Sequence, residues 1–278
     1  QETFLVPDNT QAFAFRAFGA TLKIDSNDGD LLSTAREETS RALIEKLDFI
    51  DPKTAAPDRT YGLYRDGYMF RLYENGEQIT YGKSRNNFLN FFNAVLRIAV
   101  GEHSESFIFL HAGVVGWNEK AIIMPANSYN GKTTLVAELV KCGAKYYSDE
   151  YALIDKTGKV HPFARDLSMR SNDANLREEI VSVESIGGKA GTEALPVGML
   201  LLTRYVEGRS FAPEVISVGN GIIETVPFAI TVRSDPDRTM AFLSTAFKNA
   251  LVVKSPRGEA TVEAKAILSY FDSKDADE

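Results

Sequence analysis

The chain has few of the residues that build covalent frameworks and metal centres. Its 278 residues include one cysteine and three histidines. A single cysteine cannot form a disulfide framework, and no Cys and His residues stand at the spacing of a zinc site. We expect Cys142 to pack inside the fold rather than to act as a thiol catalyst. No Gly-x-Ser-x-Gly elbow indicates a nucleophilic triad.

Long apolar runs and an excess of positive charge are also missing. No run approaches the roughly 20 apolar residues that span a bilayer, and no basic segment followed by an apolar core indicates a signal peptide. The net charge of −7 argues against a general nucleic-acid or membrane-surface binder. The content of 44% hydrophobic and 25% charged residues is typical of soluble globular proteins. We therefore expect a cytoplasmic protein with no nucleic-acid partner and no membrane partner.

The sequence predicts an α/β protein of two domains. Residues 1–105 are expected to form a smaller N-terminal α+β module with an antiparallel meander. Its predicted elements are a strand or hairpin at 13–24, a helix within 31–47, meander strands at 61–81 and a helix at 86–100. Residues 106–278 are expected to form the second domain. Its predicted elements are strands at 107–115, 121–125, 145–148, 160–163, 167–170 and 197–203, a mobile excursion at 171–191, helices at 237–251 and 260–271, and a frayed tail at 272–278.

The strongest motif is an apolar strand, a short loop and an amphipathic helix between Ala121 and Val140. The loop matches the phosphate-binding P-loop pattern with its first glycine replaced by alanine. Backbone N–H groups of such a loop and the positive end of the following helix bind phosphate. In this pattern Lys132 reaches the β- and γ-phosphates, and Thr133 ligates Mg²⁺. The predicted nucleotide-binding residues are Ala126, Asn127, Ser128, Tyr129, Asn130, Gly131, Lys132, Thr133 and Thr134.

Three further features can converge on the same phosphates. Asp149 and Glu150 follow the helix by one strand, where an acid completes a Mg²⁺ site or accepts the proton of an attacking hydroxyl. The alternative is a pair of solvated turn acids. His111, in an apolar strand, is either a group that contacts a phosphate or an acid, or a hydrogen-bonded core residue. The arginines that could offset charge at the γ-phosphate are Arg165, Arg170, Arg233 and Arg238.

The order of His111-Ala-Gly, the loop at 126–133 and the segment 143–150 resembles the HPr kinase/phosphorylase family. It is more closely similar to the HPr kinase-like proteins found beside peptide-modification genes. The likeness covers residues 106–156, and a weaker one covers 236–242. The resemblance implies the P-loop core that this family shares with phosphoenolpyruvate carboxykinase, here in residues 106–278.

The resemblance also implies roles for individual residues. Lys132 would bind phosphate and His111 would assist catalysis. Asp149 or Glu150 would be the general base, and the family has two aspartates at these positions. The implied metal ligands are Thr133 and Asp149, Arg238 would lie near the phosphates, and Glu178 or Glu179 could replace a downstream metal-binding glutamate of the family.

The sequence thus predicts an ATP-dependent and Mg²⁺-dependent kinase that transfers the γ-phosphoryl group to a hydroxyl of a protein or peptide. Serine is the favoured acceptor residue. A second hypothesis keeps this chemistry but makes the acceptor a small molecule such as an amino acid or a sugar. A third is a regulatory module that binds nucleotide without transfer, which Ala126 and Tyr129 in place of loop glycines favour. Family members often form hexamers, so a homo-oligomer is a further expectation.

Overall fold

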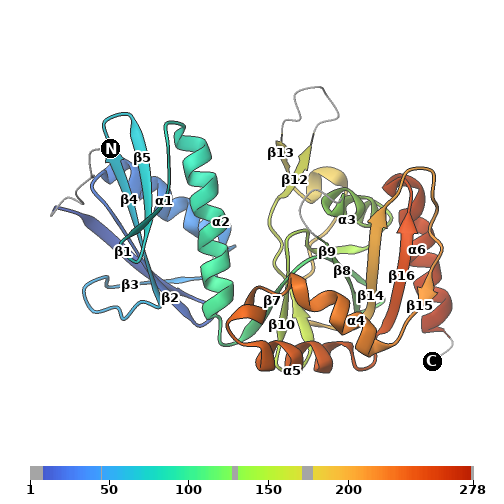
Figure 1. The fold of residues 1–278 in the computed structure, drawn as a ribbon. Helices are drawn as coiled ribbons and strands as arrows, with labels where there is room; N and C mark the ends of the chain where they lie inside the picture. Colours follow the sequence, from blue (N-terminus) through green and yellow to red (C-terminus); the bar gives the residue numbers. More distant parts are fainter. Residues whose placement is uncertain (1–8, 45, 127–130, 171–177, 277–278) are drawn as a thin grey trace. The chain divides into compact units, whose positions relative to one another are not determined.

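A computed structural model describes residues 9–44, 46–126, 131–170 and 178–276. The chain divides into two compact units, Gln1–Ser106 (unit 1) and Phe107–Glu278 (unit 2). The division lies one residue from the boundary expected from the sequence. Both units combine sheets and helices, so the protein is of the mixed α/β class (Figure 1). Within the described residues, no helix is both long enough and apolar enough to cross a membrane.

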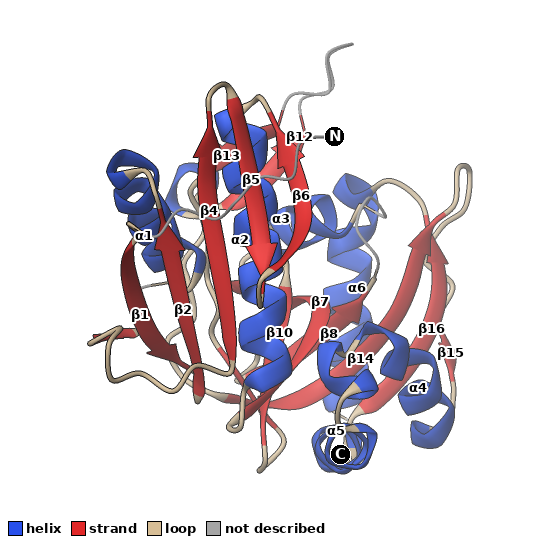
Figure 2. Ribbon diagram, turned by 60° about the vertical axis from the view of Figure 1, so that its left-hand side comes forward, coloured by secondary structure: helices blue, strands red, loops and turns tan. Residues whose placement is uncertain are grey.

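Unit 1 is a six-stranded sheet with two helices. Its elements are β1 (Gln11–Ala17), β2 (Ala20–Ser26), α1 (Gly29–Ala42), β3 (Asp48–Ile50), β4 (Arg59–Asp66), β5 (Met69–Glu74), β6 (Glu77–Gly82) and α2 (Arg85–His103). The strand order is β3-β1-β2-β4-β5-β6, and β2 and β4 run parallel. Helices α1 and α2 contact each other and pack on one face of the sheet (Figure 2).

The structure confirms the predicted hairpin and meander of unit 1. Strands β1 and β2 pair antiparallel, as do β4, β5 and β6. In the turn between β5 and β6, Asn75 and Gly76 have φ of 49° and 86°. Asn-Gly is the pair that tolerates these left-handed conformations best, so the turn chemistry alone identified this hairpin.

Unit 2 has a larger mixed sheet. Its strands are β7 (Phe107–Trp117), β8 (Lys120–Pro125), β9 (Lys145–Ser148), β10 (Tyr151–Asp155), β11 (Lys159–His161), β12 (Leu167–Arg170), β13 (Glu178–Val181), β14 (Leu195–Tyr205), β15 (Glu214–Val215) and β16 (Leu251–Arg257). The main sheet has the order β11-β10-β7-β8-β14-β16-β15, and β9 pairs with β7. Strands β8, β14 and β16 are parallel. Their carboxyl ends therefore lie at one edge of the sheet.

Helices cover both faces of the main sheet of unit 2. They are α3 (Lys132–Lys141), α4 (Val218–Thr225), α5 (Pro236–Phe247) and α6 (Ala260–Asp275), with short 3₁₀ turns at Glu184–Ile186, Val226–Phe228 and Ile230–Arg233. Buried side chains of α3 and α6 share one core with Ile122 and Met199. Those of α4 and α5 share the other core with Ile123 and Leu200. Because neighbouring strand residues point to opposite faces, a continuous apolar strand such as β8 contributes to both cores.

Two predictions for the later part of unit 2 were wrong. The helix expected to reach residue 251 ends at Phe247, because Leu251 begins the parallel strand β16. In the expected excursion, residues 171–177 lie outside the described residues. Residues 178–191 include β13 and a 3₁₀ turn, and Gly188 and Gly191 lie so close to Val140 and Tyr147 that a Cβ would clash.

The expected tail and the expected burial of the cysteine were also wrong. Residues 272–275 belong to α6, and the Trp117 indole donates to Asp272 Oδ1 at 2.6 Å. Lys120 likewise donates to Asp275. Cys142 is exposed at the end of α3 rather than packed. Helical periodicity gave no signal for the cysteine because the helix ends immediately before it.

Candidate functional site

The predicted P-loop lies between the end of β8 and the start of α3. Residues 121–124 of β8 are buried, and Gly131 precedes the helix with φ of 69° and ψ of 22°. This left-handed conformation favours glycine. The Gly131 carbonyl accepts the first helical hydrogen bond from Leu135 N at 3.1 Å. The predicted loop residues Asn127, Ser128, Tyr129 and Asn130 lie outside the described residues.

Strand β7 brings His111 to the start of α3. The Lys132 Nζ lies 3.0 Å from His111 Nε2 and 3.5 Å from Nδ1. This approach needs Gly113, because a Cβ there would lie 2.6 Å from Val136 and 3.1 Å from the Lys132 stem. The sequence His111-Ala-Gly therefore supplies a side chain at the site and, two residues later, the space for the helix.

Burial disfavours the protonated, charged forms of both His111 and Lys132. Burial, with a smaller contribution from the nearby Lys132 charge, lowers the pKa of His111 from 6.5 to about 4. His111 is therefore neutral at pH 7, and one ring nitrogen can accept from the Lys132 ammonium. Burial also lowers the pKa of Lys132 to about 8, against the attraction of Asp149 and Glu150. A desolvated ammonium of this kind is strongly stabilised when an anion binds next to it.

On the other side of Lys132, the next helix residue contacts the first predicted acid. The Thr133 hydroxyl donates to Asp149 Oδ2 at 2.9 Å, and the Tyr146 hydroxyl donates to Asp149 Oδ1 at 2.9 Å. Burial raises the pKa of the Asp149 carboxyl, while these two hydrogen bonds oppose the rise. The strand β9 places both Tyr146 and Asp149, since it ends one residue before the acid.

The second predicted acid has a different partner. Glu150 forms an ion pair with Arg165, which is one of the four arginines considered from the sequence. The Ser148 hydroxyl accepts from the backbone N–H groups of Glu150 and Tyr151 at 3.1 and 2.9 Å. These bonds fix the turn between β9 and β10. The two neighbouring acids therefore contact different side chains, Asp149 those of Thr133 and Tyr146 and Glu150 that of Arg165. They are not a pair of freely solvated turn acids.

The donors around Thr133 are of the kind that Mg²⁺ prefers. A hydroxyl and a carboxylate oxygen lie side by side there, and Mg²⁺ in phosphate sites commonly takes only one or two carboxylates, with phosphates and water completing the shell. No group of three His, Cys, Asp or Glu side chains suited to a metal ion occurs among the described residues. A site for a Mg²⁺–nucleotide complex does not require one.

The surroundings of the other predicted residues differ from one to the next. Arg238 contacts Asp235 and Phe242. Thr134 is exposed on α3. Glu179 is exposed on β13, and the side chains of Arg170 and Glu178 are not among those described. Arg233 is exposed at the end of a 3₁₀ turn.

Two residues of the site were missed in the sequence. Tyr146 holds Asp149, and Arg257 donates from Nη2 to the Gly131 carbonyl at 3.0 Å. Arg257 ends the strand β16, where no strand was predicted. The run Leu251-Val-Val was a usable signal, because it is apolar and rich in β-branched residues. Nothing in the sequence indicates that its end lies beside a loop 126 residues away.

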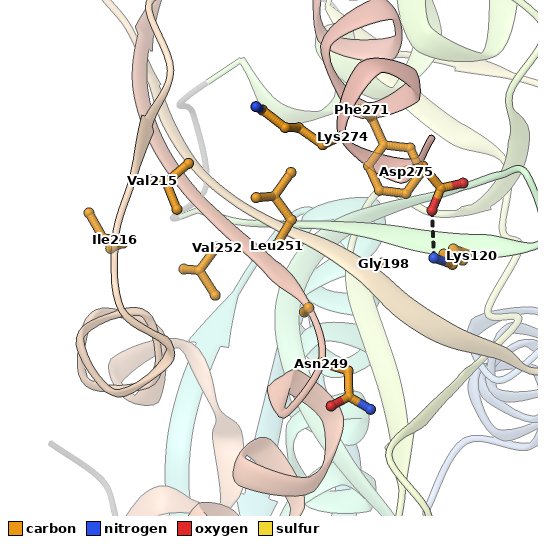
Figure 3. Close-up of a pocket in the computed structure, with 11 residues that line it drawn as sticks. Lys120, Gly198, Val215, Ile216, Asn249, Leu251, Val252, Phe271, Lys274 and Asp275 are labelled. Atoms are coloured by element: carbon orange, nitrogen blue, oxygen red, sulfur yellow. Dashed lines mark hydrogen bonds and ion pairs between the residues drawn. The ribbon is translucent and has the colours of Figure 1, made fainter. Parts of the chain in front are cut away.

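A separate cavity of about 300 Å³ lies at the opposite edge of the sheet, at the amino ends of the parallel strands (Figure 3). Lys120, Gly198 and Leu251 line it from the strands, and Phe271 and Asp275 line it from α6. None of its lining residues was predicted to bind nucleotide. The cavity and the Lys132 cluster are therefore separate features of unit 2.

Comparison of the chain with protein-family models, with curated proteins and with solved structures found no match. The family resemblance of residues 106–156 thus stays a prediction.

Proposed function

We propose that unit 2 is an ATP-dependent, Mg²⁺-dependent kinase core of the HPr kinase-like type, acting on a hydroxyl of a protein or peptide, with serine as the favoured acceptor. The observation that carries the proposal is the convergence of Lys132, His111 and the Thr133–Asp149 pair at the start of one helix. These residues come from β7, α3 and the end of β9. A strand–turn–helix connection without a ligand gives no reason for a partly buried lysine to face an uncharged imidazole.

The donor types suggest how the residues divide the work. Lys132 and the amino end of α3 would bind the β- and γ-phosphates. Thr133 and Asp149 would hold Mg²⁺, which supplies neutralising charge at those phosphates when bound. Neutral His111 would accept from the Lys132 ammonium and orient it. Because Asp149 would hold Mg²⁺, we assign the role of general base to Glu150, which pairs with Arg165.

The transfer itself needs one proton acceptor. The acceptor oxygen bonds to the γ-phosphorus while the bond from this phosphorus to the bridging oxygen breaks, and ADP leaves with that electron pair. The hydroxyl proton passes to Glu150. Because the charge on the γ-phosphoryl group is offset mainly by Lys132 and the helix end, most of the catalytic effect would be electrostatic.

The proposal is tested by incubating the protein with Mg²⁺ and γ-labelled ATP. The acceptors are peptides encoded next to its gene, serine and simple sugars. We expect label in a peptide, and label in an amino acid or sugar alone would favour a small-molecule kinase instead. Tight MgATP binding with no transfer to any acceptor would favour a regulatory module. A Lys132→Ala variant that transfers at the wild-type rate would contradict every version.

The assignment of the two acids predicts different kinetic defects. Glu150→Gln should lower kcat by about 10²-fold or more with little change in the KM for MgATP, because it removes the proton acceptor and none of the groups assigned to the nucleotide. Asp149→Asn should mainly raise the Mg²⁺ concentration needed for half-maximal rate. Glu214→Gln, an exposed acid on β15, is the control. Equal Mg²⁺ dependence of Asp149→Asn and wild type would remove Asp149 from the metal site.

A further inference from the structure

Arg257 is a buried cation at the edge of the sheet where the candidate phosphate site lies. It is the last residue of β16, and only 3% of its surface is exposed. Strand β14 lies between β16 and β8, so Arg257 reaches past a neighbouring strand to contact the loop. A guanidinium stays protonated at any physiological pH, and burying one is costly unless it has a specific set of acceptors.

Two of its acceptors are backbone carbonyls. Arg257 Nη2 donates to the Gly131 carbonyl at 3.0 Å, and Nη1 donates to the Gly258 carbonyl at 3.1 Å. The first of these carbonyls also accepts the opening hydrogen bond of α3, from Leu135 N at 3.1 Å. One oxygen thus has two donors, which fixes the direction in which the carbonyl points.

This direction also fixes a donor on the opposite side of the same peptide group. A trans peptide is planar, so the C=O of Gly131 and the N–H of Lys132 point in opposite directions, and the described residues contain no cis peptide. The carbonyl points into the first turn of α3 and toward Arg257. The Lys132 N–H therefore points out of the helix end, where N–H groups bind phosphate.

Gly131 is matched to the guanidinium sterically as well. A Cβ at this position would lie 2.9 Å from Arg257 Nη2, and the φ of 69° is unfavourable for other residues. The absence of a side chain at Gly131 thus lets the guanidinium come within hydrogen-bond distance of the carbonyl. The glycine of the Gly-Lys-Thr sequence and Arg257 form one structural unit, although 126 positions separate them.

We propose that Arg257 is a positioning residue of the nucleotide site, which holds the peptide group between Gly131 and Lys132 so that the Lys132 N–H faces the β-phosphate. The guanidinium would also place a permanent positive charge beside the Gly131 carbonyl, which favours anions near the amino end of α3. This inference rests on the proposed nucleotide binding of unit 2. It adds a residue from the far end of unit 2 to a site otherwise built within residues 111–165.

The test compares Arg257→Met and Arg257→Lys with the matched control Arg204→Met, an exposed arginine near the end of the adjacent strand β14. Isothermal titration measures the Kd of MgATP, MgADP and AMP for each full-length protein. We expect Arg257→Met to weaken the binding of MgATP and MgADP by about tenfold or more. The substitution removes a charge-assisted hydrogen bond and also releases the Lys132 N–H that donates to the β-phosphate. AMP, which has no β-phosphate, should change by less than about twofold. Arg257→Lys, which keeps the charge and one donor, should recover part of the loss.

Several outcomes would overturn the inference. If Arg257→Met bound MgATP with wild-type affinity, the contact between Arg257 and the Gly131 carbonyl would not position the Lys132 N–H for the phosphate. An equal loss of affinity for AMP and MgATP would assign a purely structural role to Arg257. The same conclusion would follow if Arg257→Lys lost as much affinity as Arg257→Met and both ligand-free variants had a lowered melting temperature. If the wild-type protein binds none of the three nucleotides, the proposed function itself fails. That result is distinct from a wild-type protein that binds them and an Arg257→Met variant that binds equally well.

Discussion

Each unit contains a partly buried cluster of charged and hydroxyl side chains, and the two clusters differ in how their charges are matched. In unit 1, Arg59 pairs with Glu74 and with Glu102, both at 3.1 Å, and the Tyr61 hydroxyl donates to Glu74 at 2.7 Å. We call these four residues the matched cluster. In unit 2, Lys132 faces the neutral ring of His111, and among the described residues no carboxylate lies within ion-pair distance of its Nζ.

The two clusters also differ in the direction in which the fold shifts the pKa of the cation. Burial alone would lower the pKa of Arg59, but Glu74 and Glu102 outweigh it, and the pKa is raised. The pKa of Lys132 is lowered to about 8, because burial outweighs the more distant Asp149 and Glu150. The fold therefore stabilises the charge of Arg59 and opposes the charge of Lys132. A cluster that is complete without a ligand serves the structure, whereas one that lacks an anion is suited to bind one.

Replacing the lysine should give the largest separation between binding and stability. In Lys132→Met, we expect MgATP affinity to fall by about 100-fold or more, because the cation proposed to bind the phosphates is removed. The free energy of unfolding of unit 2 should stay the same or rise by about 1–2 kcal/mol, since a desolvated charge is removed. Titration calorimetry and urea unfolding, followed by the fluorescence of Trp117, measure the two quantities. Trp117 is the only tryptophan and lies in unit 2.

The control for this prediction is Lys265→Met, a change of an exposed lysine on α6. It should alter neither quantity measurably. If Lys132→Met instead destabilised unit 2 by more than about 2 kcal/mol, the lysine would belong to a matched cluster like that of unit 1, and the contrast would disappear.

Replacing the arginine of the matched cluster should have the opposite result. In Arg59→Met, two carboxylates lose their cation, and we expect unit 1 to lose about 2 kcal/mol of stability, less than a fully buried pair because its side chain is 24% exposed. MgATP affinity should not change. Far-UV circular dichroism during urea unfolding reports on both units, while Trp117 fluorescence reports on unit 2.

An exposed ion pair provides the comparison for Arg59. Lys254 pairs with Glu224 at 2.7 Å on the surface of unit 2, and Lys254→Met should cost less than about 1 kcal/mol. Equal costs for Arg59→Met and Lys254→Met would mean that partial burial adds nothing to the matched cluster.

A dependence of stability on pH is expected to arise from His111. Its pKa is about 4 in the folded protein, against 6.5 for an unperturbed histidine, so the unfolded chain binds more protons between these values. Stability therefore falls as pH decreases through this window, by about 2 kcal/mol at pH 5 from this group alone. His111→Gln cannot titrate and should lack that part of the fall. The difference in unfolding free energy between wild type and His111→Gln, measured from pH 7.5 to pH 5, should therefore change with pH, and a constant difference would contradict the prediction.

Local sequence signals predicted the parts of the site that lie close together in the chain. The apolar run of β8, the glycine at 131 and the helical spacing of residues 135–140 are short-range patterns, and each element formed where it was expected. Asp149 and Glu150 were located from their place one strand after the helix. The structure places Asp149 against Thr133 and Glu150 against Arg165, a distinction that no spacing contains.

Contacts between distant segments could not be predicted in this way. Which of the arginines approaches the loop depends on the strand order β8-β14-β16, and this order depends on packing of the whole unit. Four arginines were considered and Arg257 was not among them, because residues 252–259 were assigned to no element. Likewise, Asp272 and Asp275 looked like solvated acids in the sequence, and only the fold brings them to Trp117 and Lys120.

The central place of β14 has a consequence for how the protein is made. This strand pairs with β8, which precedes it in the chain, and with β16, which follows it. On the ribosome, the sheet of unit 1 has all its strands once residue 82 is available, whereas that of unit 2 waits for residue 257. Domains tend to fold in order of synthesis. A growing chain would therefore carry a finished unit 1 while the edge of β14 that pairs with β16 is still open, and Gly131 would acquire its contact with Arg257 only near the end of translation.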